Sequence, residues 1–122
     1  MAIVPRNHAL NIAGAATASL LLLVASGVAS AQAPDGAAAE ALMKKSECFQ
    51  CHAAARKKDG PSFKEMVAKY KDKPRAEAET SMYKVLTEKP KVKVDGKEEP
   101  HDTLKTKDDG EVRNVVKYIL TF

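Results

Sequence analysis

Both cysteines of the chain lie in one short segment, where two residues separate Cys48 from Cys51 and His52 follows directly. Thiols and an imidazole at this spacing can form a structural disulfide, a zinc site, a redox-active dithiol or an attachment site for covalent haem. Each of these sites makes a different demand on the rest of the sequence, which can therefore be used to choose among them.

The surrounding sequence disfavours the first three sites. A disulfide across two residues closes a loop too short to constrain the unfolded chain much. A dithiol of the thioredoxin type expects a βαβ setting, and the sequence predicts no alternation of strands with helices. A zinc site would need His101 as its fourth ligand, and the adjacency of Cys51 and His52 does not match the usual spacing of zinc ligands.

The fourth site, covalent haem, uses every residue of the motif. C-x-x-C-H is the attachment signature of c-type haem. The two thiols add to the haem vinyl groups, and two intervening residues let one helical turn place both sulfurs along one edge. The imidazole behind them then reaches the iron. We therefore predict one covalent haem c, held by Cys48 and Cys51, with His52 as the proximal iron ligand.

The first 31 residues have the three-part pattern of a secretory signal peptide. A short head with one basic residue, Arg6, precedes an apolar stretch centred on LLLLVA and a small-residue Ala-Ser-Ala end. We predict cleavage after Ala31, export to a bacterial periplasm, and a mature domain of residues 32–122 without a membrane span. An uncleaved membrane anchor is the alternative, which the short and interrupted apolar run disfavours.

The mature segment is small and poor in aromatic residues. It has no Trp, three Phe and three Tyr. A domain of this size buries a limited share of its surface, and such domains usually carry a disulfide, a metal or another staple. A large planar cofactor is therefore also expected from the composition.

Charge is modest and mostly from lysine. Loss of Arg6 from the 20 basic residues leaves 19 against 16 acidic ones, a formal charge of +3. The segment ARKK (55–58), just after the cysteine motif, predicts either a basic rim that steers acidic redox partners or an ordinary solvated surface. Nucleic acid is not an expected partner, because the sequence is predicted to be exported and has no clustered basic and aromatic residues.

The apolar spacing predicts an all-α domain. Four helices are expected, over residues 35–52, 62–73, 76–89 and 106–122. Asp35 and Ser62 are the expected N-caps of the first two helices, and Thr106 with Asp109 resembles a capping box for the last. Residues 90–106 contain two prolines, an Asp-Gly turn and a weak KVKV alternation, which predicts a loop or at most a small hairpin.

Residues 37–121 resemble the small class I bacterial cytochromes c, of the c-551/c-552 type. The similarity lies in ALMKKSECFQCH, GPSFKEMVAKYK and GEVRNVVKYIL. It implies about four helices around one haem, with the first and last helices crossing near Tyr118 and Phe49. It also implies that the Pro61 carbonyl accepts a hydrogen bond from His52, which fixes the ring and raises its basicity.

The distal iron ligand is where the sequence departs from this family. Its members usually supply a methionine from a PMPP-like loop before the last helix, and the loop here reads EEPHDT. We predict that His101 takes that role, which gives bis-histidine ligation and a low reduction potential. Met66 and Met82 lie on apolar helical faces and are expected in the core. A vacant or water-bound position, Met82, or a lysine such as Lys91 or Lys93 are the alternatives.

The predicted function is that of a periplasmic electron-transfer protein, not an enzyme. It would exchange single electrons with redox protein donors and acceptors, after cytochrome c maturation machinery attaches the haem. No catalytic residues are expected, because no paired acid and base is evident. The alternative is a gas-binding sensor or weak peroxidase, which requires His101 to be off the iron.

Overall fold

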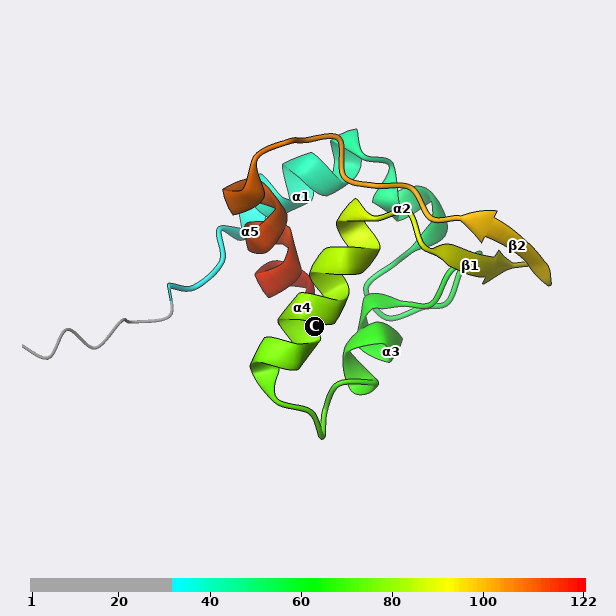
Figure 1. The fold of residues 1–122 in the computed structure, drawn as a ribbon, viewed down its shortest axis with the longest axis horizontal. Coiled ribbons are helices and arrows are strands. Elements are labelled where there is room, and N and C mark those ends of the chain that lie inside the picture. The colour runs from blue at the N-terminus through cyan, green and yellow to red at the C-terminus, as the bar shows by residue number, and fades with distance from the viewer. Residues whose placement is uncertain (1–31) are drawn as a thin grey trace, which may run out of the picture. The chain divides into compact units, whose positions relative to one another are not determined.

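The computed structural model of the protein describes residues 32–122 (Figure 1). Within this range the chain forms five helices and one two-stranded hairpin. In chain order they are α1 (Gly36–Lys45), α2 (Cys48–Cys51), α3 (Phe63–Ala68), α4 (Arg75–Thr87), β1 (Lys91–Val94), β2 (Lys97–Pro100) and α5 (Asp109–Ile119). The predicted signal peptide, residues 1–31, lies outside the described residues.

The prediction of one helix over residues 35–52 is wrong, because a corner separates α1 from α2. Asp35 caps α1 as expected, since its side chain accepts a hydrogen bond from the backbone N–H of Ala38 at 3.0 Å. At the other end Glu47 has a left-handed backbone with φ of 64°, which breaks the helix. An ion pair with Lys105, at 2.6 Å, holds the Glu47 side chain at this corner.

The expected cap of α3 is confirmed. Ser62 and Glu65 form a complete capping box, in which the serine hydroxyl accepts from the Glu65 N–H and the carboxylate accepts from the Ser62 N–H. The helix is shorter than predicted and ends at Ala68. The next helix, α4, ends two residues before the predicted end, because Lys89 is left-handed and a proline follows it.

The capping box predicted for the last helix is wrong in its residues. Asp108 is the N-cap of α5, and its side chain accepts from the Glu111 N–H at 3.0 Å. The Thr106 hydroxyl instead contacts the Glu111 carboxylate and accepts from the Asp108 N–H. The helix therefore begins at Asp109, two residues later than it would with a cap at Thr106.

The core lies where α5 packs against α1 and α4. The buried apolar residues that form it are Ala39, Leu42, Met43, Phe63, Ala78, Met82, Leu86, Leu104, Val112, Val115, Val116, Ile119 and Leu120. The crossing of the first and last helices near Tyr118 is confirmed: a β carbon at Gly36 would lie 3.1 Å from the Tyr118 ring. Phe49 packs edge-on against Phe63, with ring centres 6.0 Å apart.

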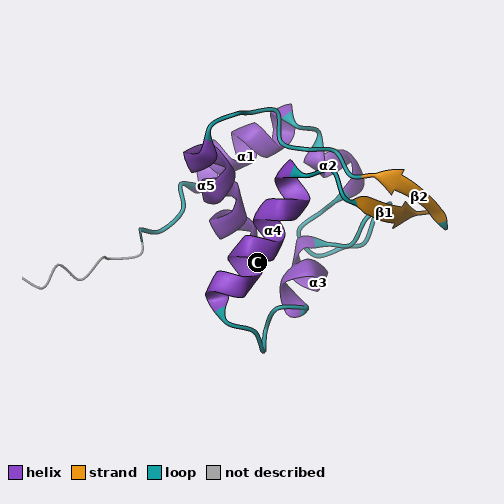
Figure 2. Cartoon of the chain, viewed as in Figure 1, coloured by secondary structure: helices purple, strands orange, loops and turns teal. Residues whose placement is uncertain are grey.

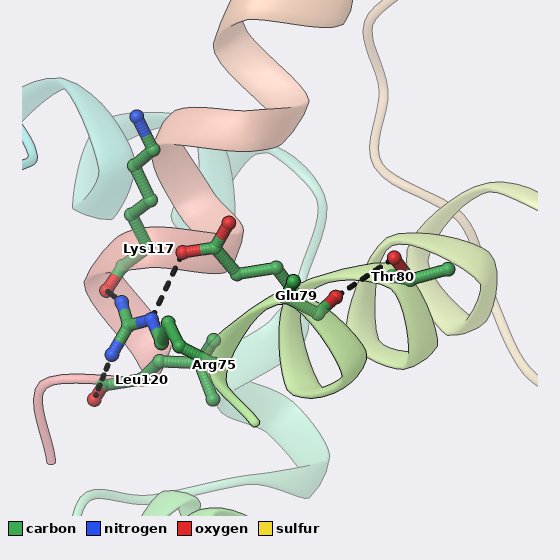
Figure 3. A network of polar contacts seen from close by, with 6 residues as sticks. Arg75, Glu79, Thr80, Lys117 and Leu120 are labelled. Atoms are coloured by element: carbon green, nitrogen blue, oxygen red, sulfur yellow. Dashed lines mark hydrogen bonds and ion pairs between the residues drawn. The ribbon is translucent and has the colours of Figure 1, made fainter. Parts of the chain in front are cut away.

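Arg75 joins the start of α4 to the end of α5 (Figure 3). Its guanidinium donates to the backbone carbonyls of Leu120 at 3.3 Å and Lys117 at 3.5 Å, while Glu79 holds its Nε at 2.9 Å. Both carbonyls lie at the C-terminal end of α5. The last C=O groups of a helix have no N–H partner within it, so the guanidinium fills this role here. A cation there also compensates the negative end of the helix dipole.

The segment between α4 and α5 forms the hairpin that the sequence allowed (Figure 2). Its strands pair antiparallel, with Lys93 opposite Glu98 and Val94 opposite Lys97. The fold is thus helix-rich, as predicted, with this hairpin as its one sheet among residues 32–122. Within the same residues, no helix combines the length and apolar character needed to cross a membrane.

Candidate cofactor site

A cavity of about 340 Å³ brings together all the site residues that the sequence predicted. It lies among α2, α3, α4 and the hairpin, and its volume is in the range of small-molecule and cofactor sites. Cys48, Cys51, His52, Pro61 and His101 all line it. Much of the remaining lining is apolar and includes Phe63, Met66, Met82, Val85, Leu86 and Val92.

The two cysteines occupy the first and last positions of the single-turn helix α2. Residues three apart lie on the same face of a helix, so both side chains can face the cavity. Cys48 is partly buried, Cys51 is exposed, and both are free thiols. Burial raises the pKa of the Cys48 thiol. The pair is therefore available for bonding to a group in the cavity.

His52 follows α2 directly, and its ring is hydrogen-bonded to a backbone carbonyl. Its Nδ1 lies 2.7 Å from the Pro61 carbonyl oxygen, which can only accept, so Nδ1 carries the proton. Nε2 of the neutral ring then keeps a free lone pair. The Gly60 N–H donates to the Cys51 carbonyl at 2.9 Å, which brings the Gly60-Pro61 segment up against the ring. This is the arrangement of a metal-binding imidazole with its supporting acceptor.

His101 reaches the same cavity from the end of β2. Its ring centre lies 6.0 Å from that of His52, and the two ring planes are inclined by 39°. Metal–imidazole bonds are about 2 Å long and each nitrogen lies about 1 Å from its ring centre. Two imidazoles on opposite sides of one metal ion therefore have centres about 6 Å apart, and the observed spacing fits an iron between them.

The environment of His101 also fits a ligand. Its Nδ1 is buried and has no hydrogen-bond partner among residues 32–122, which is unusual for a buried polar atom. Burial lowers the pKa of His101; the backbone of Asp102 acts in the opposite direction, and His52 lowers the pKa further. The ring is therefore neutral at pH 7, the form that a metal ion binds.

Other candidate ligands lie in the cavity wall. Met82 is buried and Met66 half-buried, and both line the cavity together with Lys93. The sequence placed Met66 and Met82 on apolar helical faces and predicted both in the core, with Met82 and Lys93 among the alternative distal ligands. His101 differs from them in that its ring centre lies 6.0 Å from that of His52. Among residues 32–122 no three His, Cys, Asp or Glu side chains gather closely enough to hold a metal ion, which leaves the zinc alternative without a site.

A second, more polar cavity of about 490 Å³ adjoins the first. Four lysines line it: Lys57, Lys58, Lys69 and Lys93. Asp59, Glu65 and Asp95 lie in the same wall, so the surface is mixed rather than purely basic. Pro61, Lys69 and Lys93 line both cavities, which puts this charged surface beside the cofactor site.

Comparison with known proteins identifies the cofactor that this site holds. The family model for cytochrome c matches residues 36–122. The chain belongs to the cytochrome c family. This cytochrome c therefore carries covalently bound haem c and serves haem-based electron transfer between redox partners. A comparison with curated protein sequences found no match.

Solved structures place this cytochrome c in class I. The class 1 cytochrome MtoD from Sideroxydans lithotrophicus ES-1 is 36% identical, with a TM-score of 0.67, over 73% of this chain and 97% of that one. Cytochrome c552 from Nitrosomonas europaea is 28% identical, with a TM-score of 0.51, over 67% of this chain and 96% of that one. The helix-rich fold is thus that of the class I cytochromes c.

Proposed function

We propose that this cytochrome c is a six-coordinate, bis-histidine electron carrier of low potential. Cys48 and Cys51 would bind the haem through thioether bonds, and His52 and His101 would be its axial ligands. The observation that best supports this assignment is the 6.0 Å spacing of the two imidazole centres across the cavity. The haem iron, when bound, supplies the one-electron chemistry between the ferric and ferrous states.

The protein's own groups would favour the ferric state. The Pro61 carbonyl accepts the Nδ1 proton of His52 at 2.7 Å and so makes Nε2 a stronger donor. His101 adds a second imidazole in place of the softer methionine sulfur, which in related sites raises the potential. Both effects lower the reduction potential. With both axial positions filled, no open site is left for oxygen or peroxide, which favours electron transfer over enzymatic turnover.

Electrons would leave at the edge of the site where Cys51 is exposed. The lysines of the adjoining polar cavity lie beside the cofactor site, and they favour redox partners that present acidic residues. We further propose that residues 1–31 direct export to the periplasm, where cytochrome c maturation machinery attaches the haem.

The test is optical and magnetic spectroscopy of the haem-loaded protein, oxidised and reduced. We expect a low-spin ferric spectrum with the near-infrared band of bis-imidazole ligation and without the weak far-red methionine–iron band. His101→Ala should then become high-spin, whereas Met82→Leu and Lys93→Ala should keep the wild-type spectrum. A methionine band would instead assign the distal position to Met82 or Met66. A high-spin wild type that binds carbon monoxide would favour the gas sensor or peroxidase.

A further inference from the structure

We propose that the β1–β2 hairpin is the device that positions the distal histidine, and that its left-handed Asp95-Gly96 turn fixes the register that sets His101 opposite His52. This inference rests on the proposed function, because it takes His101 as a ligand of the iron. Asp95 and Gly96 are thus positioning residues, although neither is among the residues that line the cofactor site.

The first step is the hydrogen-bond ladder of the hairpin. Lys91 is paired with Pro100 at its base, and the His101 N–H donates to the Pro90 carbonyl at 2.8 Å, one step beyond that pair. His101 is therefore held as an extension of the ladder. Because side chains alternate along a strand, a slip of one residue in the register would turn the His101 imidazole away from His52.

The second step is how the rest of the segment is anchored. After His101, the Leu104 N–H donates to the Leu86 carbonyl at 3.1 Å, and the Leu104 side chain is buried. The next residue, Lys105, donates its N–H to the Ser46 hydroxyl at 2.9 Å. These contacts hold the chain beyond His101 to the ends of α4 and α1. The backbone N–H of His101 itself is held by the base of the hairpin.

The third step is what the hairpin covers. Val92 and Val94 are half-buried and line the cofactor cavity, as does the exposed Lys93. Glu99 and Pro100 of β2 also line the cavity, so the hairpin forms one wall of the site, and His101 follows directly after it. Opening of the hairpin would uncover the cavity and withdraw the distal imidazole in one movement.

A substitution in the Asp95-Gly96 turn can test the positioning role of the hairpin. Asp95 has φ of 48° and Gly96 φ of 81°, the pair of positive values that a type I′ turn requires. A β carbon at Gly96 would meet no atom within 4 Å. Substitution there therefore tests backbone conformation alone. Valine is strongly disfavoured at positive φ, while asparagine tolerates it, so the two residues make a matched pair.

The experiment compares Gly96→Val with Gly96→Asn in the full haem-loaded protein. The readouts are the rate of carbon monoxide binding to the ferrous form and the bis-imidazole fraction of the ferric form by electron paramagnetic resonance. We expect Gly96→Val to speed carbon monoxide binding on the order of tenfold, because the strain favours the open hairpin. Gly96→Asn should stay within about twofold of wild type, and His101→Ala should give the upper limit.

The outcomes separate this inference from the proposed function. If the wild type is bis-imidazole and Gly96→Val binds carbon monoxide no faster than Gly96→Asn, the positioning role is wrong and the function stands. If the wild type is not bis-imidazole, the ligand assignment fails and the inference fails with it. Gly96→Ala, a milder change, should fall between the other two variants and serves as the test should Gly96→Val not assemble.

Discussion

Gly60 passes so close to His52 that a β carbon at position 60 would lie 2.4 Å from Cε1 and 2.8 Å from Nδ1 of the imidazole. Only a glycine fits at this distance. The close approach lets the next residue, Pro61, present its carbonyl to Nδ1 at 2.7 Å. The glycine is thus part of what holds the His52 ring in place.

Gly60→Ala should therefore displace the His52 ring or the backbone beside it. We expect a loss of about 1–3 kcal/mol in the free energy of unfolding, as for other overpacked sites. A weaker hydrogen bond to Pro61 should also change the reduction potential. Denaturant unfolding and voltammetry measure the two effects. Gly110→Ala is the milder control, because its β carbon would approach a single atom, the Asp108 carboxylate oxygen at 3.1 Å, and no ring; equal losses in both variants would contradict the argument.

Ser62 should be a more important cap than Asp108. Its side chain is fully buried and its hydroxyl lies 2.9 Å from the Glu65 carboxylate, whereas the Asp108 cap is exposed. Replacing a helix cap with alanine costs about 0.5–2 kcal/mol. We expect Ser62→Ala near the upper end of this range and Asp108→Ala near the lower end. Urea unfolding of the two variants side by side decides the order.

The capping box should also make the fold sensitive to acid. Hydrogen bonds from the backbone N–H and hydroxyl of Ser62 lower the pKa of Glu65 below its ordinary value of 4.5, helped by Lys57 and Lys69. The native state therefore favours the ionised carboxylate. The resulting stability is present above pH 4.5 and is lost as the pH falls through the lower pKa of the folded state.

Glu65→Gln should remove this part of the pH dependence. Unfolding free energies measured from pH 7 down to acid should decline less steeply in the variant than in the wild type. Glu47 and Asp109, whose pKa values are lowered by Lys105 and by Arg113, keep the remaining dependence. The exposed hairpin residue Glu98, changed to glutamine, is the control and should leave the slope as it is. Parallel curves for wild type and Glu65→Gln would refute the role of the box.

The parts of the fold that the sequence predicted correctly are those fixed by nearby residues. The cap at Ser62 and the turn at Asp95 each depend on neighbours within a few positions, and both are found. The interruption at Glu47 was missed, because an ion pair with Lys105, 58 residues away, accompanies it. The prediction placed the cap of the last helix at the wrong residue, because three acidic or hydroxyl side chains near Asp108 offer similar local patterns.

In the cofactor site, too, the features set by neighbouring residues were predicted and those set by tertiary packing were not. The motif at Cys48 and His52 predicted the cofactor without knowledge of the fold. That Met66 and Met82 line the cavity depends on how α3 and α4 pack, and an apolar stripe looks the same whether it faces a core or a cofactor. The 6.0 Å spacing of the two histidine rings, likewise, follows from the path of the hairpin and not from their separation in sequence.

Lys89 should be a position where a substitution stabilises the protein. It follows the C-cap of α4 with φ of 48°, a conformation for which glycine is preferred. The left-handed backbone costs other residues about 1–2 kcal/mol, partly offset by the greater entropy of glycine in the unfolded chain. We expect Lys89→Gly to gain about 0.5–1 kcal/mol. Lys91→Gly, in the extended strand β1, should lose stability; a loss in both would contradict the conformational argument.

His101→Met should raise the reduction potential by restoring the ligand type that this family usually supplies. A thioether stabilises ferrous iron better than an imidazole does, and axial ligands shift haem potentials on the order of 0.1 V or more. The Pro90–His101 backbone bond does not involve the side chain, so the hairpin should still deliver the new residue to the cavity. Voltammetry and the far-red methionine–iron band are the measurements. An unchanged potential would mean that position 101 does not face the iron.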